Sequence, residues 1–381
     1  CGLLCTNVAL TLTGATYVYC MDEYAFALCA AAAAAWCFAR GRWWMAAGLG
    51  ALVVSLAVYQ PYFTVAAVLC MLDILRRTAA GENAKRLLLA GVRYLGLLAG
   101  FVLYYAAWTG VCAALGVAKI RVEESVLGSG LGAILRLTVG ANVDYVRSLL
   151  DGSGVLGWFL PLLHVLLLAA LLWRLVTLLA DRTLPWGNKA LLVLLVCLLP
   201  TALNSAAILM AGNETQLMTF GGELFYLLPL MGREPEVRRS WKPALRTALA
   251  VVLCGVLWQH VVYANQVYVK KDLDKNATLV LAARMLDRIE ETEGYVPGET
   301  PVAFVGRLDD NETLNRGREA FADLDHTVGL WSDYAATYNL GRYLTDYLNA
   351  PLAWDTETDF SELAEVQAMP AFPAAESVAV I

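Results

Sequence analysis

Long apolar runs separated by short polar segments fill the first two thirds of the chain. Nine runs can be distinguished, near residues 1–20, 24–39, 44–59, 62–75, 87–116, 155–180, 190–211, 219–232 and 247–267. A helix needs about 20 mostly apolar residues to cross a bilayer, and several of these runs are shorter. The pattern predicts a membrane α-helical bundle of about nine transmembrane helices, give or take about two.

The run over residues 43–75 is too long for one span and short for two, and Gln60 and Pro61 interrupt it. Basic side chains lie on both flanks, at Arg40, Arg42, Arg76, Arg77, Lys85 and Arg86. Basic loops favour the cytoplasm, so both flanks are expected on the inner side. That placement requires a hairpin or a re-entrant loop.

Extending this topology places three basic segments inside. These segments are the flank 76–86 and two further ones, 181–189 and 233–246. The segment 117–152 then lies outside, and its mixture of aliphatic and charged side chains predicts one or two helices at the outer interface. We therefore expect a multi-pass protein of the cytoplasmic (plasma) membrane, surrounded by membrane lipids, with its C-terminal part outside the cell.

Charge divides the chain into two predicted domains. Residues 1–268 carry 19 Lys and Arg against 13 Asp and Glu, whereas residues 269–381 carry 9 against 21. With 59% hydrophobic and 16% charged residues overall, a wholly soluble protein is excluded. The second domain has a helix-period run at 273–291, a strand at Pro301–Gly306 and a helical run at 334–348, which predict a small acidic α/β domain. An acidic exterior gives no reason to bind nucleic acid.

Cysteine usage indicates neither a disulfide framework nor a zinc site. All nine cysteines precede residue 255, without the spacing of metal ligands. The chain opens with Cys1 in an apolar run and has no basic leader, so we expect that its true N-terminus is missing.

Asp22 and Glu23 are the first candidates for chemistry, because two adjacent carboxylates lie at the predicted outer mouth without a basic neighbour. Such carboxylates can act as a catalytic base or hold a divalent cation such as Mg²⁺ or Mn²⁺. The alternative is that they only cap a turn at the membrane edge.

Five further residues are candidates for substrate binding. Tyr59 and Gln60 lie at the polar break beside Pro61, where they could line a cavity and bind a sugar, or where Pro61 only breaks a helix within an aromatic interface belt. Arg121, Arg136 and Arg147 lie on the outer interfacial segment, where a guanidinium suits a lipid phosphate. Ordinary anchoring to head groups is the alternative for each arginine.

Three ionisable residues fall within or near the predicted spans. Glu223 is costly in a membrane if it is unpaired, so it is expected to face the bundle interior or a wet cavity. His164 and His260 lack a partner at metal-ligand spacing, and each is expected to be a hydrogen-bonded membrane histidine.

Several short stretches resemble the polytopic glucosyltransferases of the GtrII type, which are named from O-antigen serotype conversion. The stretches are Tyr19–Leu28, Ser55–Tyr62, Tyr263–Tyr268, Ala283–Ile289 and Pro301–Gly306. The run Ser55-Leu-Ala-Val-Tyr59-Gln60 is the most distinctive.

The resemblance implies a GT-C-like transferase that moves a hexose, glucose in the named family, from a polyprenyl-phosphate sugar to a cell-surface glycan on the outer face. Such enzymes place a catalytic carboxylate in the first outer loop and more acidic residues after it. Asp22 and Glu23 match only the second position.

Two other classes of function compete with the transferase. A transporter or flippase for a lipid-linked precursor should show broken helices and ionisable residues near the membrane midplane, whereas the polar features here gather at the predicted outer ends. A membrane anchor for an exterior binding domain explains the acidic tail but not a bundle of this size.

Overall fold

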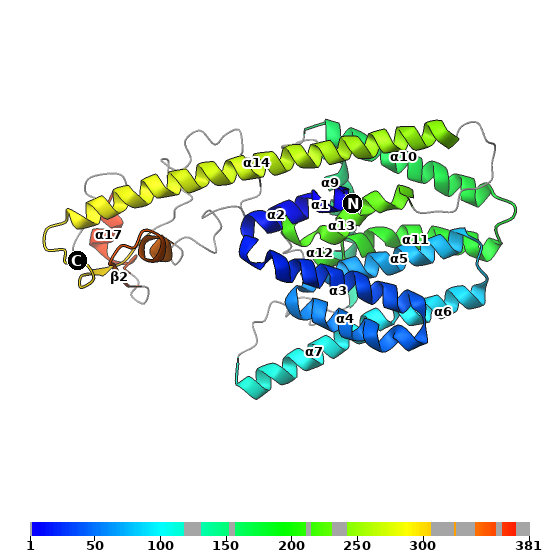
Figure 1. Ribbon diagram of the computed structural model, residues 1–381, viewed down its shortest axis with the longest axis horizontal. Helices are drawn as coiled ribbons and strands as arrows, with labels where there is room; N and C mark the ends of the chain where they lie inside the picture. The colour runs from blue at the N-terminus through cyan, green and yellow to red at the C-terminus, as the bar shows by residue number, and fades with distance from the viewer. Residues whose placement is uncertain are drawn as a thin grey trace. The chain divides into compact units, whose positions relative to one another are not determined.

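The computed structural model describes residues 2–117, 131–151, 157–210, 215–230, 242–305, 324, 340–355 and 360–370 (Figure 1). The chain divides into two compact units, Cys1–Ala264 and Asn265–Ile381. Each unit is described by itself.

The first unit is helical. Its elements are α1 (Gly2–Cys5), α2 (Val8–Thr16), η1 (Val18–Cys20), α3 (Met21–Arg40), η2 (Arg42–Trp44), α4 (Met45–Val58), η3 (Gln60–Tyr62), α5 (Phe63–Ala79), α6 (Ala84–Tyr94), α7 (Gly96–Leu115), α9 (Leu131–Leu150), α10 (Phe159–Ala180), α11 (Trp186–Leu203), α12 (Ser205–Leu209), η4 (Gln216–Met218), α13 (Phe220–Glu223), η5 (Leu224–Leu230) and the first part of α14 (Lys242–Glu290).

Five helical stretches within the described ranges are long and apolar enough to cross a membrane. They are Val18–Arg40, Ala84–Leu115, Phe159–Ala180, Trp186–Leu203 and Pro243–Glu290. The chain is therefore a helical membrane protein, while the larger number of nine spans stays a prediction. Helices α4 and α5, with 14 and 17 residues, are shorter than a straight span requires.

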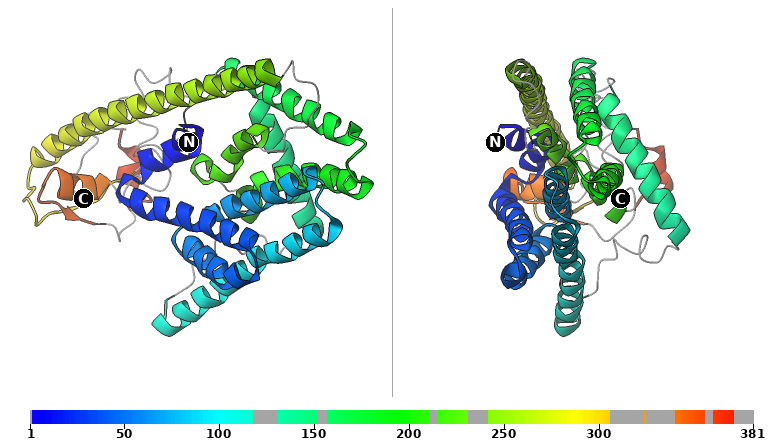
Figure 2. Two further views of the ribbon diagram at one scale, coloured as in Figure 1. Left: turned by 45° about the vertical axis from the view of Figure 1, so that its right-hand side comes forward. Right: turned by 90° about the vertical axis from the view of Figure 1, so that its right-hand side faces the viewer.

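Phe38 is packed at one end of the bundle, where α3, α4 and α7 meet. Its ring is fully buried, and a Cβ atom at Gly48 or Gly96 would come within 2.6 or 2.8 Å of it. The two glycines therefore allow the helices to approach this ring closely. Figure 2 shows α3 and α4 running side by side along the same part of the unit.

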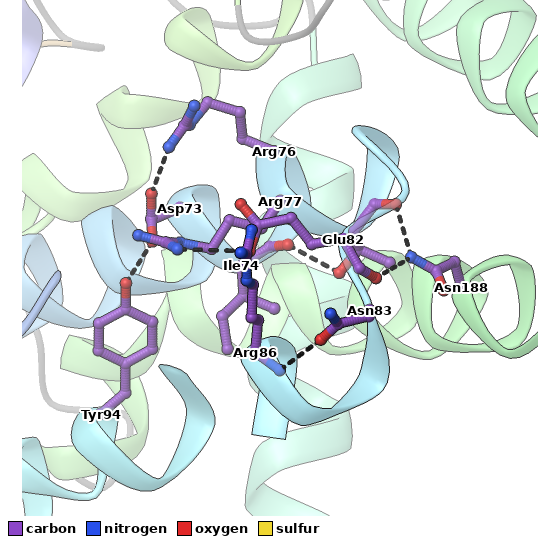
Figure 3. A network of polar contacts seen from close by, with 10 residues as sticks. Asp73, Ile74, Arg76, Arg77, Glu82, Asn83, Arg86, Tyr94 and Asn188 are labelled. Atoms are coloured by element: carbon purple, nitrogen blue, oxygen red, sulfur yellow. Dashed lines mark hydrogen bonds and ion pairs between the residues drawn. The ribbon is translucent and has the colours of Figure 1, made fainter. Parts of the chain in front are cut away.

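A polar network joins α5 to α6 at the same end (Figure 3). Asp73 accepts a hydrogen bond from Arg76 Nη2 at 3.0 Å and further hydrogen bonds from Arg77 Nε and the Tyr94 hydroxyl. Tyr94 lies two residues before Gly96, so the end of α5 comes to the end of α3. The chain therefore reverses between α4 and α5, as predicted for a hairpin.

Asn188, in the first turn of α11, fastens that helix to the same network (Figure 3). Its buried side-chain amide donates to the carbonyl oxygens of Thr78 at 3.1 Å and Glu82 at 3.0 Å. These carbonyls belong to the end of α5 and the turn that follows it. We call this end of the unit, which carries Arg40, Arg42, Arg76 and Arg77, the basic end.

Tryptophan rings cover two of these arginines. The Arg40 guanidinium carbon lies 4.5 Å from the centroid of the Trp36 ring, and that of Arg42 lies 4.6 Å from the centroid of Trp43. Trp43 is one of the most exposed large side chains in the first unit. Tryptophan and arginine together are typical of the boundary between a bilayer and water.

The second unit has a small core around Ala282, Leu340 and Leu344. Two strands of two residues each, β1 (Pro301–Val302) and β2 (Ala353–Trp354), pair in parallel. A π-helical turn, η7 (Tyr343–Tyr347), and α17 (Ala364–Ala368) complete the described elements. The predicted strand is therefore shorter than expected, the helical run is described only from Leu340, and the α/β domain is not confirmed.

The predicted helical run at 273–291 is helical up to Glu290, but it is not an element of its own. Helix α14 runs without a break from Lys242 to Glu290, so the predicted last span and the predicted first helix of the tail are one element. The physical reason is that neither glycine nor proline occurs between Gly255 and Gly294. A change from apolar to polar composition does not by itself end a helix.

Candidate functional site

Asp22 and Glu23 occupy the first turn of α3, and both are exposed. Carboxylates are favoured there, because the unpaired backbone N–H groups give a helix N-terminus a partial positive charge. Both therefore lie at the opposite end of α3 from Arg40. This position fits a base that meets a substrate, and it fits a simple helix start equally well.

Four aromatic rings lead from this turn into the bundle, and we call them the aromatic row. Ring centroids are 4.7 Å apart between Tyr24 and Tyr59, 4.8 Å between Tyr59 and Tyr62, and 5.9 Å between Tyr62 and Phe220. The row brings Tyr59 to the helical turn that carries Asp22. Tyr24 and Phe220 were not among the candidates from the sequence.

Gln60 is held differently. Its side-chain amide donates a hydrogen bond of 2.6 Å to the Tyr104 hydroxyl on α7. The structure therefore brings Tyr59 to α3 and ties Gln60 to α7. A single cavity shared by Asp22, Tyr59 and Gln60 stays a prediction.

Arg136 and Arg147 both lie on α9, with exposed side chains. They are about three helical turns apart, so they share one face of the helix with roughly 16 Å between them. Arg147 Nη1 lies 3.6 Å from Asp144 Oδ1, an exposed ion pair of little energetic weight. Arg121 lies outside the described residues.

Two asparagines hold α9 against the bundle. The Asn142 amide donates to Thr201 Oγ1 at 2.8 Å, and the Asn204 amide donates to the carbonyl oxygen of Ala141 at 2.8 Å. The predicted helix in the segment 117–152 is therefore present. One of its sides is fastened to α11 and to the junction of α11 with α12.

A largely buried cluster of histidine, tyrosine and glutamate lies next to the C-terminal end of α9. His164 Nδ1 lies 2.7 Å from the carbonyl oxygen of Leu149, and its Nε2 lies 2.7 Å from the Tyr226 hydroxyl. A neutral imidazole donates only once, so Nδ1 donates to the carbonyl and Tyr226 donates to Nε2. His164 is hydrogen-bonded at both nitrogens, as predicted.

Glu223 faces the bundle interior, as expected, and its carboxylate lies near the imidazole of His260. Glu223 Oε2 and His260 Nε2 are 3.9 Å apart, and their side chains are 14% and 1% exposed. His260 Nδ1 has no hydrogen-bond partner among the described residues, which corrects the prediction for this histidine. The sequence could not place Glu223 opposite a residue 37 positions away.

Two glycines make the position of Glu223 possible. A Cβ atom at Gly221 would collide with the Thr64 side chain on α5, and one at Gly222 would come within 3.1 Å of the Tyr145 ring on α9. The carbonyl of Gly222 accepts a hydrogen bond of 2.9 Å from the Tyr145 hydroxyl. Helix α13 is thus wedged between α5 and α9.

An apolar cavity of about 330 Å³ lies between α5, α9, α10 and α11. Leucines line most of it, and Arg76, Tyr145 and Arg174 are the polar residues of the lining. The α9 residues Val146 and Leu149 form part of the wall. The cavity therefore has the lining expected for a hydrocarbon chain.

Asp22 and Glu23 provide two carboxylates for a divalent cation, which prefers at least six oxygen ligands. No group of three or more His, Cys, Asp or Glu side chains that could hold a metal ion occurs among the residues described above.

These features define a polytopic membrane protein with carboxylates at one end of a helical bundle and an apolar cavity inside it. A family model described as Glucosyl transferase GtrII matches residues 2–228, which is more than half of the chain. The protein therefore belongs to the GtrII glucosyl transferase family, and it is a glycosyltransferase. No curated protein and no solved structure matches the chain.

Proposed function

We propose that the protein transfers glucose from a polyprenyl-phosphate sugar to a hydroxyl of a cell-surface glycan, on the outer face of the plasma membrane. Membership of the GtrII family is the observation that supports glucosyl transfer. The exposed carboxylates at the start of α3 support a reaction at the end of the bundle opposite the basic end. Basic residues favour the cytoplasm, so that end faces outward.

In this mechanism Asp22 removes the proton from the acceptor hydroxyl as its oxygen bonds to the anomeric carbon. The bond between that carbon and the phosphate oxygen breaks, and its electron pair stays on the phosphate. Arginine side chains stabilise the charge of the departing phosphate. Glu23 is the second candidate for the base.

The apolar cavity supports a lipid-linked donor. Its wall includes Val146 and Leu149 of α9, and Arg147 lies between these residues in the sequence. A prenyl chain in the cavity would therefore lie against the helix that carries Arg136 and Arg147. This arrangement favours a donor with an apolar tail and an anionic head.

A transporter is the second candidate function, and the Glu223–His260 pair is the observation that favours it. Buried ionisable pairs are typical of transport pathways. The sequence indicated that polar features gather at the outer ends, and this pair is an exception. Membership of a glucosyl transferase family favours the transferase over the transporter.

The test is glucosyl transfer by membrane vesicles supplied with radiolabelled polyprenyl-phosphate glucose. Asp22→Asn should lower the rate by about 100-fold or more, the loss typical of a missing general base. Glu291→Gln, which removes an exposed carboxylate after the end of α14, is the matched control and should change nothing. Equal rates for Asp22→Asn, Glu23→Gln and the unsubstituted protein would reject both residues as the base.

A further inference from the structure

The Glu223–His260 pair has hydrogen-bonding capacity that the described residues do not use. Glu223 Oε2 and His260 Nδ1 are both buried without a hydrogen-bond partner among them. Leaving such groups unsatisfied is expensive, and a lone carboxylate in a membrane bundle is especially costly. Groups kept at this cost are candidates for binding a polar ligand.

The surrounding contacts hold the pair in place without satisfying it. The Tyr226 ring centroid lies 5.5 Å from that of His260, but the Tyr226 hydroxyl proton is already donated to His164. Gly221 and Gly222 bring α13 close to its neighbours and so fix the backbone before Glu223. The pair is therefore a preorganised polar site.

Other unpartnered polar atoms occur on elements that pack around α13. The Tyr59 hydroxyl and Thr215 Oγ1 are buried and have no hydrogen-bond partner within the described part of the chain. Tyr59 directly precedes η3 and Thr215 directly precedes η4. Helix α13 packs against η3 and α2, and η4 packs against α2 as well. Unpartnered polar atoms therefore also occur next to elements that pack against α13 or against its neighbour α2.

We propose that Glu223 and His260 bind hydroxyl groups of the glucosyl unit that is transferred, an inference that rests on the proposed function. A sugar carries several hydroxyl groups, so one can donate to Glu223 Oε2 while another donates to or accepts from His260 Nδ1. A phosphate is disfavoured beside Glu223 because both are acidic.

The experiment measures equilibrium binding of radiolabelled polyprenyl-phosphate glucose to the purified full chain in detergent micelles. Unlabelled analogues that each lack one sugar hydroxyl compete with it. The unsubstituted protein should bind at least one analogue about 10- to 100-fold more weakly, the loss expected when a charged group loses its hydrogen-bond partner. Glu223→Gln and His260→Asn should reduce that discrimination to about twofold or less.

Controls separate this role from a structural one. Glu291→Gln should retain the full discrimination, and thermal unfolding checks that each variant is folded. If Glu223→Gln weakens every donor by the same factor, the residue only supports the fold and the inference is wrong. If a variant does not fold, the test rests on whether the unsubstituted protein discriminates among the analogues that lack one hydroxyl.

Two further outcomes are distinguishable. Uniform binding of all analogues by the unsubstituted protein overturns this inference and leaves the proposed donor intact. Absence of any binding of polyprenyl-phosphate glucose overturns the proposed donor and this inference together.

Discussion

Ser55 donates a hydrogen bond from its buried hydroxyl to the backbone carbonyl oxygen of Ala27, over 2.8 Å. The bond joins α4 to α3 one helical turn from Tyr59, and Tyr59 packs against Tyr24 on α3. Ser55 begins the stretch that most resembles the GtrII family. Its hydroxyl fixes the register in which the two tyrosines meet.

Replacing this serine tests the register. Ser55→Ala should lower the free energy of unfolding by about 1 kcal/mol, because one interhelical hydrogen bond is lost in the membrane. Reversible unfolding in detergent micelles measures the change. Ser148→Ala, which removes an exposed hydroxyl from α9, is the control. Equal stability of the two variants would show that the bond contributes nothing.

Gly221 is predicted to tolerate no side chain. Gly221→Ala should destabilise the protein by about 1–3 kcal/mol, because the added methyl group meets Thr64. Gly140→Ala is the control, since a Cβ atom on that α9 residue meets nothing within 4 Å. The control should leave stability unchanged or raise it by up to about 1 kcal/mol. Thermal unfolding that ranks the two variants the other way would refute the wedged position of α13.

Asn188 provides a test of the basic end. Asn188→Ala leaves two backbone carbonyls without their side-chain donor and should cost about 1–3 kcal/mol. Asn188→Asp should cost more, because a carboxylate would face the two carbonyl oxygens. Denaturant unfolding of both variants gives the order. An aspartate variant as stable as the unsubstituted protein contradicts the donor role of the amide.

The candidate arginines of the segment 117–152 separate donor binding from anchoring; of these, Arg136 and Arg147 lie on α9. Arg121→Gln, Arg136→Gln or Arg147→Gln should sharply weaken transfer from the sugar-phosphate donor while expression and membrane insertion stay intact. General attraction to anionic lipids is worth only about 1 kcal/mol per basic residue. The kinetics of each single variant and of the triple variant measure the effect. Unchanged transfer in the triple variant means that the phosphate binds elsewhere.

The side of the membrane occupied by residues 269–381 can be tested by thiol labelling. The chain has no cysteine after Cys254, so Ser332→Cys introduces a unique thiol into this part. A membrane-impermeant reagent on intact cells should label it, and proteolysis should assign the label to the tail. The unsubstituted chain is the background control. Labelling only after the membrane is breached would invert the proposed topology.

The sequence predicted the features that depend on local pattern. Basic flanks and the Gln60-Pro61 break indicated the reversal between α4 and α5, and the mixed pattern within 117–152 indicated α9. The free-energy cost of exposing an unpaired carboxylate to lipid was enough to predict that Glu223 faces the interior. Each of these follows from the polarity of a short segment, which is visible without a structure.

Features that depend on packing were not predicted. The contact between Tyr24 and Tyr59 and the approach of Glu223 to His260 join residues far apart in the chain, and no periodicity encodes such pairs. Gly221 and Gly222 form no recognisable motif in the sequence, because their role depends on the Thr64 and Tyr145 side chains opposite them. The single helix α14 was missed because polarity was taken as a boundary.

Helix α3 has 20 residues, which gives it a length of about 30 Å, close to the thickness of the hydrocarbon core. Trp36 and Arg40 favour the head-group level at one end, so Asp22 and Glu23 reach the opposite head-group level with little length to spare. The thickness of the bilayer should therefore influence the rate of glucosyl transfer. Thicker lipids would draw these carboxylates toward the hydrocarbon or tilt the helix. Glucosyl transfer in reconstituted vesicles should consequently fall as the acyl chains lengthen.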